Sequence, residues 1–155
     1  MRLVRSITLV GALLLVTSLS GCDYGTLAGP AAIRMVDEDL VVVVCRDVTV
    51  VTARLTLLQD GNAERLWEAS GRIELGRGDQ LSPSQPPEGL ESDLLERHAA
   101  MPGATLSLVL LAPERPGVNG DIYADFRVPL DGIPQNTWLQ SDGSLTNGEC
   151  DGWIE

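Results

Sequence analysis

The sequence predicts an all-β fold, an immunoglobulin-like β-sandwich of about seven to nine short strands with at most one short helix. Stretches in which apolar and polar residues alternate recur along the chain, and residues 121–128 are the clearest of them. Glycine, proline and asparagine residues typical of turns separate these stretches. Only one stretch is a candidate helix. A small β-barrel would satisfy the same pattern and is the alternative.

The first half of the chain holds the segments with the strongest β character. Residues 40–45 form an unbroken apolar run of strand length, which indicates burial on both faces. Along residues 48–58 apolar and polar residues alternate, but the phase slips at Val50-Val51, which indicates a β-bulge or a strand boundary. Asp60-Gly61-Asn62 predicts a hairpin turn, and Ser70-Gly71 is expected to end the returning strand. We therefore expect strands over residues 33–36, 40–45, 48–58, 63–69 and 72–75.

The second half combines strands with the candidate helix. Residues 76–89 are rich in glycine and proline, so we expect a loop there. Leucines recur at helical spacing within residues 90–100, which predicts a short helix, with an extended segment as the alternative. Asp142-Gly143 predicts a second hairpin turn. Strands are expected over residues 105–111, 121–128 and 137–140, and from Leu145 toward Cys150.

The first 21 residues have the features of a signal peptide. Arg2 and Arg5 are the only charged residues before Asp23, and they are followed by an apolar run and by small residues. The segment ends in Leu19-Ser20-Gly21-Cys22, a leucine, two small residues and a cysteine. These residues resemble the lipobox of bacterial lipoproteins, in which the cysteine thiol is diacylated and the chain is cleaved just before it. An ordinary secretory signal with an incidental cysteine is the alternative.

The resemblance implies an address and a domain organisation. Residues 1–21 would be removed as a signal peptide, and residues 22–30 would form a flexible linker anchored through acyl chains on Cys22. Residues 31–155 would form a single sandwich domain. Two or more acyl chains hold a protein stably on a membrane, at about 0.8 kcal/mol for each buried methylene. We therefore expect the chain on the extracytoplasmic face of the cell membrane, tethered to it and not spanning it.

Cys45 and Cys150 are the two cysteines that are left once Cys22 is assigned to lipid. In an oxidising compartment an even pair favours a disulfide, so we expect these two residues to be joined. The bond would close a long loop and tie the last strand to the second one. Two buried thiols are the alternative, and a metal site is not expected because two cysteines and one histidine lack the spacing of a zinc site.

Charge and composition exclude several chemistries. All 11 basic residues are arginines, so no lysine is present for a P-loop, a Schiff base or a serine–lysine dyad. Two of these arginines and none of the 22 acidic residues lie in residues 1–21, which leaves a formal charge of −13 on the rest. Such a charge excludes nucleic acid as a partner. It provides solubility or, as the alternative, attracts cations or a basic partner.

No residue pattern marks a catalytic or metal site, and we expect no cofactor. His98 is the only histidine, and no G-x-S-x-G nucleophile elbow accompanies it, so we expect a solvated side chain. Residues 142–147 place oxygen atoms at alternate positions, as an EF-hand loop does. However, Asn147 and Trp153 stand where that loop needs glycine and glutamate. Asp37-Glu38-Asp39 is expected to be a solvated turn, with a cation site shared with distant loops as the alternative.

Two classes of function follow from these observations. The first is a non-enzymatic binding or scaffold domain, anchored by lipid in the cell envelope, that meets a protein partner. It accounts for the anchor, the size, the strand pattern and the missing catalytic set. The alternatives are an accessory lipoprotein that binds small molecules or cations, and a small hydrolase that uses paired carboxylates. Because aromatic residues are so few, we expect Trp67, Trp138 and Trp153 in the core or at strand edges and not on a sugar-stacking surface.

Overall fold

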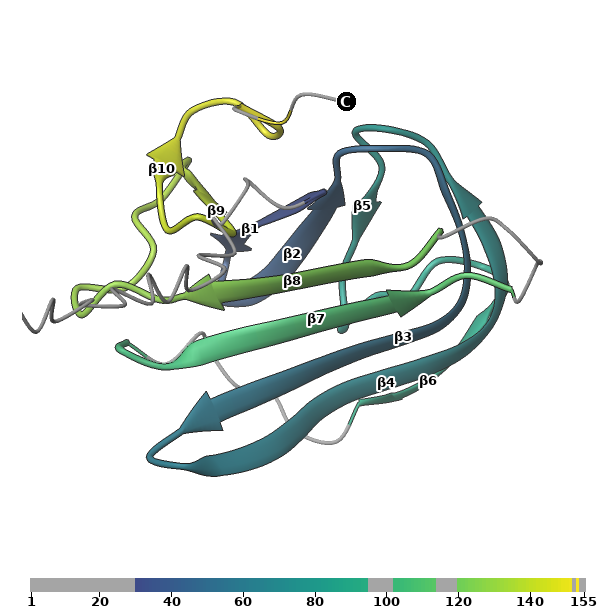
Figure 1. Cartoon of the computed structure of the whole chain (residues 1–155), viewed down its shortest axis with the longest axis horizontal. Coiled ribbons are helices and arrows are strands. Elements are labelled where there is room, and N and C mark those ends of the chain that lie inside the picture. Colours follow the sequence, from purple (N-terminus) through teal and green to yellow (C-terminus); the bar gives the residue numbers. More distant parts are fainter. Residues whose placement is uncertain (1–29, 95–101, 114–119, 152, 154–155) are drawn as a thin grey trace, which may run out of the picture.

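The computed structural model describes residues 30–94, 102–113, 120–151 and 153, and these residues form two antiparallel β-sheets (Figure 1). The prediction of an all-β sandwich is confirmed, and the two sheets do not close into a barrel. The described ranges contain no helix. Residues 1–29, with Cys22 and the whole signal segment, lie outside them. The ten strands are β1 (Ala31–Val36), β2 (Asp39–Val44), β3 (Val48–Gln59), β4 (Asn62–Leu75), β5 (Gln80–Leu81), β6 (Leu90–Leu94), β7 (Thr105–Leu111), β8 (Ile122–Arg127), β9 (Trp138–Gln140) and β10 (Leu145–Thr146).

The two sheets hold five strands each and differ in strand length. Sheet A has the order β10-β9-β1-β2-β5, and only β1 and β2 in it are longer than three residues. Sheet B has the order β6-β4-β3-β7-β8 and is built around β3 and β4, which have 12 and 14 residues. The hairpin β1–β2 belongs to sheet A, and the hairpins β3–β4 and β7–β8 belong to sheet B.

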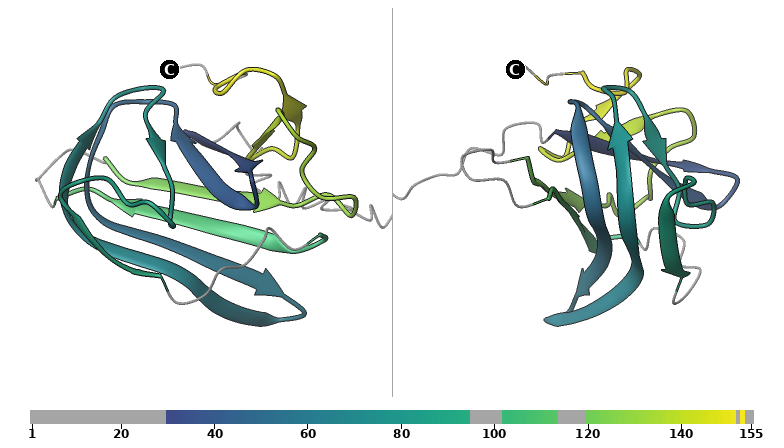
Figure 2. Two further views of the ribbon diagram at one scale, coloured as in Figure 1. Left: turned by 180° about the vertical axis from the view of Figure 1, so that it is seen from behind. Right: turned by 90° about the vertical axis from the view of Figure 1, so that its right-hand side faces the viewer.

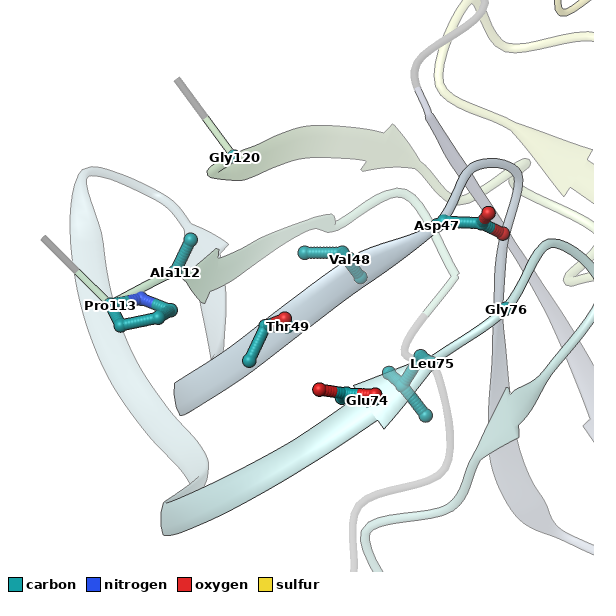
Figure 3. Close-up of a pocket in the computed structure, with 9 residues that line it drawn as sticks. All are labelled: Asp47, Val48, Thr49, Glu74, Leu75, Gly76, Ala112, Pro113 and Gly120. Carbon is teal, nitrogen blue, oxygen red and sulfur yellow. The ribbon is translucent and has the colours of Figure 1, made fainter. Parts of the chain in front are cut away.

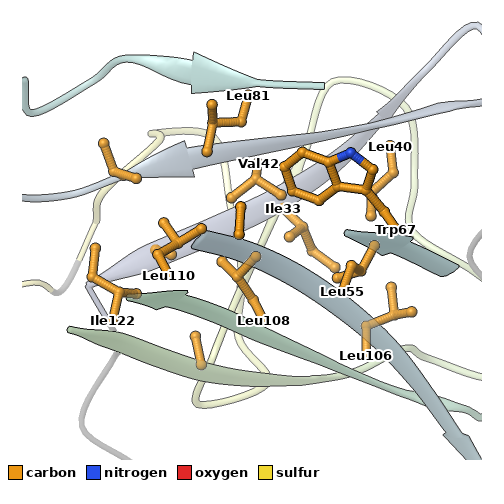
Figure 4. Close-up of a cluster of buried hydrophobic side chains, with 14 of the residues drawn as sticks. Ile33, Leu40, Val42, Leu55, Trp67, Leu81, Leu106, Leu108, Leu110 and Ile122 are labelled. Carbon is orange, nitrogen blue, oxygen red and sulfur yellow. The ribbon is translucent and has the colours of Figure 1, made fainter. Parts of the chain in front are cut away.

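The core lies between the two sheets, where alternation along each strand directs every second side chain inward. In β8 the side chains of Ile122, Ala124 and Phe126 are buried, as the sequence predicts. Figure 4 shows the indole of Trp67, from β4, close to Leu40 of β2 and above the leucines of sheet B. The valines of β2 are buried on both faces, because Val42 enters this core and Val43 packs on the opposite face of sheet A.

The long hairpin β3–β4 bends along its length (Figure 2). Its register shifts between Val50 and Thr52 and again between Leu55 and Thr56, and at both places β4 contributes one more residue than β3. These two bulges account for the two additional residues of β4, and bulges bend a strand and increase its twist. At the second bulge the consecutive residues Leu66 and Trp67 are both buried. The phase slip at Val50-Val51 therefore marks a bulge and not a strand boundary.

Three sequence-based expectations are wrong. The segment that begins at Leu90 starts with strand β6, which pairs with β4, so residues 90–94 adopt the extended alternative, and residues 95–100 of the expected helix lie outside the described residues. The expected loop of residues 76–89 contains β5, which pairs with Val42 and Val43. Ser70-Gly71 does not end the returning strand, because β4 continues through it. A methyl group at Gly71 would collide with the carbonyl oxygen of Gly89, so glycine here lets the neighbouring chain approach and β6 join the sheet.

The predicted disulfide between Cys45 and Cys150 is present, with 5.4 Å between the two Cα atoms. Cys45 directly follows β2, and Cys150 lies four residues after β10, a strand that is shorter than expected. Cys150 packs on the outer face of sheet A against a small second cluster of buried side chains, Ala32, Val43 and Trp138. The bond therefore holds the C-terminal segment onto sheet A.

Candidate functional site

The sandwich has two ends with different features. At the disulfide end, the backbone N–H of Cys45 donates a 2.7 Å hydrogen bond to the carbonyl of Pro30, where the described chain begins. The register of β1 and β2 places their turn, Asp37-Glu38, at the other end of sheet A, which we call the hairpin end. The hairpin of β3 and β4 runs in another direction and ends at a different corner of the molecule (Figure 2). In Figure 1 the turn between β3 and β4 lies at the lower left, far from the start of β3 at the upper right.

A cleft of about 520 Å³, the hairpin cleft, lies at the hairpin end. The end of β1 and the turn after it form one wall, and the loop before β9 forms the other. β1 and β9 are adjacent in sheet A, with Ile33 opposite Leu139, so the two walls belong to neighbouring strands. The lining residues are Arg34, Met35, Val36, Asp37, Glu38, Gln135 and Asn136.

Unfavourable backbone conformations are concentrated at the hairpin cleft. Four described non-glycine residues have a positive φ, and three of them line the cleft: Asp37 at 49°, Glu38 at 71° and Asn136 at 61°. The fourth is Asp60 in the turn between β3 and β4. A side chain in this region of φ costs about 1–2 kcal/mol per residue. At Asp37 and Glu38 the hairpin itself accounts for this conformation, because they are the two residues between the paired Val36 and Asp39, and type I′ hairpin turns require a positive φ at both. Asn136 is the cleft residue whose positive φ no hairpin turn explains.

Arg34 is the one cationic side chain that lines the hairpin cleft. Its guanidinium carbon lies 4.5 Å from the ring centroid of Trp138, which is only 2% exposed. Its Nε atom is buried and has no hydrogen-bond partner, and within the described residues no carboxylate forms an ion pair with it. Among the described residues Arg46 and Arg54 are also half-buried, and their Nε atoms likewise lack a partner, but their terminal nitrogens are hydrogen-bonded. Arg54 pairs with Glu68, and Arg46 donates to the carbonyls of Gly120 and Asp121.

Exposed apolar side chains also favour the hairpin end. Of the five large hydrophobic residues that the described structure exposes, Val36 lines the hairpin cleft and is 39% exposed. Leu130 is 84% exposed and lies in the loop that leads from β8 to Gln135 and Asn136 of the cleft. Leu130 lies three residues after β8 and adjoins Gly103. Exposed apolar side chains gathered in one region are typical of a protein-binding surface.

A second cleft, of about 550 Å³, lies at the disulfide end among the ends of β3, β4, β7 and β8 (Figure 3). Val48 and Leu75 contribute apolar side chains, and Asp47 and Glu74 contribute carboxylates. One oxygen of Asp47 accepts the backbone N–H of Arg77, so this carboxylate holds a loop. Pro113 and Gly120 complete the lining, and residues 114–119 between them lie outside the described residues.

Within the described part of the chain, the residues that the sequence suggests for a metal site do not come together. Cys22 and His98 lie outside the described residues. Asp142 accepts the backbone N–H of Ser144 at 2.8 Å, and hydrogen bonds from Ser144 hold the pKa of this carboxyl below its usual range. Asp142 therefore stabilises a turn. No group of three or more metal-binding side chains occurs among the residues that were placed.

The three tryptophans do not form a shared binding surface. Trp67 is buried in the core, and its indole N–H donates to Ser92 at 2.8 Å. Trp138 is buried on the outer face of sheet A, whereas Trp153 is half-buried and its indole nitrogen has no partner. The expectation of core or edge positions is confirmed for Trp67 and Trp138.

The outer face of sheet B holds the two other side chains with a shifted pKa. Hydrogen bonding from Arg54 lowers the pKa of Glu68, and the charge of Arg65 adds to this effect. Partial loss of hydration raises the pKa of Tyr123, although its side chain is largely exposed, and the nearby charge of Asp121 raises it further. The shift of Glu68 therefore reports its pairing with arginine, and that of Tyr123 reports its immediate surroundings.

Comparison with protein-family models, with curated proteins and with solved structures finds no match to this chain. Among the described residues, no helix has the length and the apolar character needed to cross a membrane. Sequence reasoning identified the acidic turn and Trp138 but did not bring them together with Arg34. The fold brings residues 133–136 to this region from a distant part of the sequence. No local pattern of residues indicates that they lie there.

Proposed function

We propose that this protein is a non-enzymatic binding domain, held by lipid on the extracytoplasmic face of the cell membrane, whose hairpin end meets a protein partner. The anchor rests on the lipobox-like residues Leu19-Ser20-Gly21-Cys22. The observation that carries the binding role is the position of the hairpin cleft, with the exposed Val36 and Leu130 on the segments that form it, at the end of sheet A opposite the start of the described chain.

The connection to the anchor gives the domain an orientation. Pro30 follows Cys22 by eight residues, so an extended linker reaches at most about 29 Å. Pro30 is held at the disulfide end by its hydrogen bond with Cys45. A lipid anchor on Cys22 would therefore keep the disulfide end within that reach of the membrane. The hairpin end, at the far end of sheet A, would be free to extend away from the membrane, where a partner can reach it.

Site-specific photocrosslinking in intact membranes tests this orientation. A photoreactive amino acid replaces Leu130 at the hairpin end or Arg77 at the disulfide end, both of which are exposed. We expect Leu130 to crosslink to one discrete envelope protein and Arg77 to give no such product. The same protein captured from Arg77 alone would refute the orientation, and no protein product from either position would refute the binding role.

The anchor is tested separately by intact mass. The mass expected of the membrane-extracted chain is that of residues 22–155 with acyl chains, and Cys22→Ser should release the protein from the membrane. An unacylated chain in the wild type would refute the anchor. The crosslinking result would then still report on the binding surface.

A further inference from the structure

We propose that the hairpin cleft binds the carboxyl terminus of a partner polypeptide that ends in a basic residue, with Arg34 as the group that receives the terminal carboxylate. The inference rests on the proposed function in one respect, namely that the hairpin end is the surface a partner reaches. The chemistry of the cleft does not depend on the lipid anchor.

Arg34 is prepared for an anion in three ways. The indole of Trp138 lies 4.5 Å from the guanidinium carbon, which fixes its direction and removes water from one face. Within the described residues no carboxylate pairs with it, although acidic residues greatly outnumber arginines in this chain. A guanidinium presents a planar fork of N–H donors that matches a carboxylate. A terminal carboxylate therefore completes the coordination that the fold leaves open.

The remaining walls fit a peptide end. The cleft volume of about 520 Å³ lies in the range typical of small-ligand sites, about 300–1,000 Å³, and suits one or two terminal residues. Val36, which is 39% exposed, offers an apolar side chain on the face of β1 that carries Arg34, and Met35 adjoins the cleft from the core side of the strand. The exposed amides of Gln135 and Asn136 can donate to and accept from a peptide backbone.

The carboxylates of the cleft select a basic end. Asp37 and Glu38 line the same cleft as Arg34, and Asp39 follows them directly. These groups repel a simple anion, and the net charge of the chain, −11, adds to the repulsion. A ligand that carries an ammonium or guanidinium group beside its carboxylate can pair the cation with Asp37 or Glu38 and the carboxylate with Arg34. Asp37 and Glu38 are exposed, so we expect the cation to contribute less than the carboxylate.

The probe is the peptide acetyl-Ala-Leu-Lys in three forms: the free acid, the carboxyl-terminal amide, and the free acid with norleucine in place of lysine. The mature acylated chain in nanodiscs carries ¹³C-methyl methionine and ¹⁵N-indole tryptophan. Met35 lines the cleft and Trp138 lies under Arg34, so their NMR signals report binding. Trp67, buried in the core, is the internal control for folding.

We expect the free acid to shift the Met35 and Trp138 signals in a saturable manner at low salt. The amide should bind at least tenfold more weakly, and the norleucine peptide about threefold more weakly. Arg34→Gln should weaken binding of the free acid at least tenfold. Arg127→Gln removes an equal charge from the exposed end of β8 and should change the affinity less than twofold.

Equal binding of acid and amide, or wild-type affinity in Arg34→Gln, would overturn the proposal. An equal loss of affinity in Arg127→Gln would show that net charge alone causes the effect, and this would also overturn the proposal. A shift of the Trp67 signal in Arg34→Gln would indicate a change in the core, and Arg34→Lys then serves as the test variant. We expect Arg34→Lys to keep the fold and to bind the free acid at least threefold more weakly than wild type. Absence of peptide binding together with a persistent Leu130 crosslink would refute this inference and leave the proposed function standing.

Discussion

Sheet B is held together mainly by its own backbone, whereas sheet A depends on side chains and one covalent bond. In sheet B the long strand β3 is paired along much of its length with β4 on one side and with β7 on the other. In sheet A, β5, β9 and β10 have only two or three residues each. Short ladders bury little surface and make few hydrogen bonds, so sheet A needs further connections. The Cys45–Cys150 bond and the amide of Gln140 provide them.

The difference has a functional consequence. The candidate binding surface, with Arg34, Trp138 and the hairpin cleft, belongs to sheet A and its loops. It therefore lies on the sheet whose strands are joined by shorter backbone ladders. Binding sites are often placed on elements of lower local stability, supported by a rigid scaffold. Sheet B is that scaffold here. This difference predicts that a variant that breaks the side-chain or disulfide connections of sheet A unfolds sheet A before sheet B.

The largest effect is expected from loss of the disulfide. The Cys45→Ala/Cys150→Ala double variant opens a loop with a sequence separation of 105, and the chain-entropy model gives a loss of roughly 4–5 kcal/mol in the free energy of unfolding. Urea unfolding measures the loss. Hydrogen exchange should accelerate more in β9 and β10 than in β3 and β7. Equal acceleration in both sheets would show that the disulfide supports the whole domain and not sheet A in particular.

The second test targets sheet B, where Gly71 of β4 and the carbonyl of Gly89 approach closely and β6 pairs with β4. Gly71→Ala places a methyl group against the carbonyl of Gly89 at a φ of +154°, so β6 must move away from β4. We expect a loss of about 3 kcal/mol, because overpacking typically costs about 1–3 kcal/mol and backbone strain adds to it. The matched control is Gly143→Ala, which has a positive φ of +86° but no atom within 4 Å of the new methyl group.

Gly143→Ala should therefore lose only about 1 kcal/mol, the cost of the backbone conformation alone. Thermal unfolding of the two variants gives the difference. If both variants lose the same stability, the contact between Gly71 and Gly89 does not constrain sheet B, and the attachment of β6 needs another explanation.

Gln140 tests the side-chain connections of sheet A. This residue is fully buried, and its Nε2 donates to Thr146 Oγ1 at 2.9 Å and to the carbonyl of Glu149 at 3.3 Å. Gln140→Leu leaves these acceptors without a donor, which we expect to cost about 1–2 kcal/mol. Thr146→Val removes one acceptor of the same network. A double-mutant cycle by urea unfolding should show coupling between the two changes, and strict additivity would contradict a shared network.

The same contrast between the sheets explains how far the sequence could predict the structure. Alternation in β7 and β8 and the apolar run in β2 predicted these strands, because one buried face imposes a period of two and burial on both faces removes it. The spacing of Leu90 and Leu94 predicted a helix where β6 forms, because residues four apart lie on one face of a helix and also on one face of a strand. β5 was missed, because two residues between prolines and glycines carry no period.

The disulfide could be predicted by counting cysteines, but the hairpin cleft could not be predicted from local pattern. Arg34 falls in a predicted strand and Asp37-Glu38-Asp39 in a predicted turn. Their proximity to Gln135 and Asn136 depends on β9 pairing with β1, about one hundred residues away along the chain. Strand order is set by long-range packing, and periodicity gives no information about it.

The smallest effect is expected at Glu68, on the exposed outer face of sheet B. Its carboxylate accepts hydrogen bonds from Arg54 at 2.8 Å and from Arg65, and bonding from Arg54 is the main cause of its lowered pKa. Because the folded-state pKa lies below the unfolded one, the stabilisation is complete above the unfolded pKa and is lost as the pH falls through the folded pKa. Glu68→Gln should therefore destabilise the protein slightly at neutral pH, and the difference from wild type should shrink under acid. Urea unfolding across that pH range measures it. A difference independent of pH would mean that the pairing is absent in solution, and sheet B would then rest on its backbone ladders without help from surface charges.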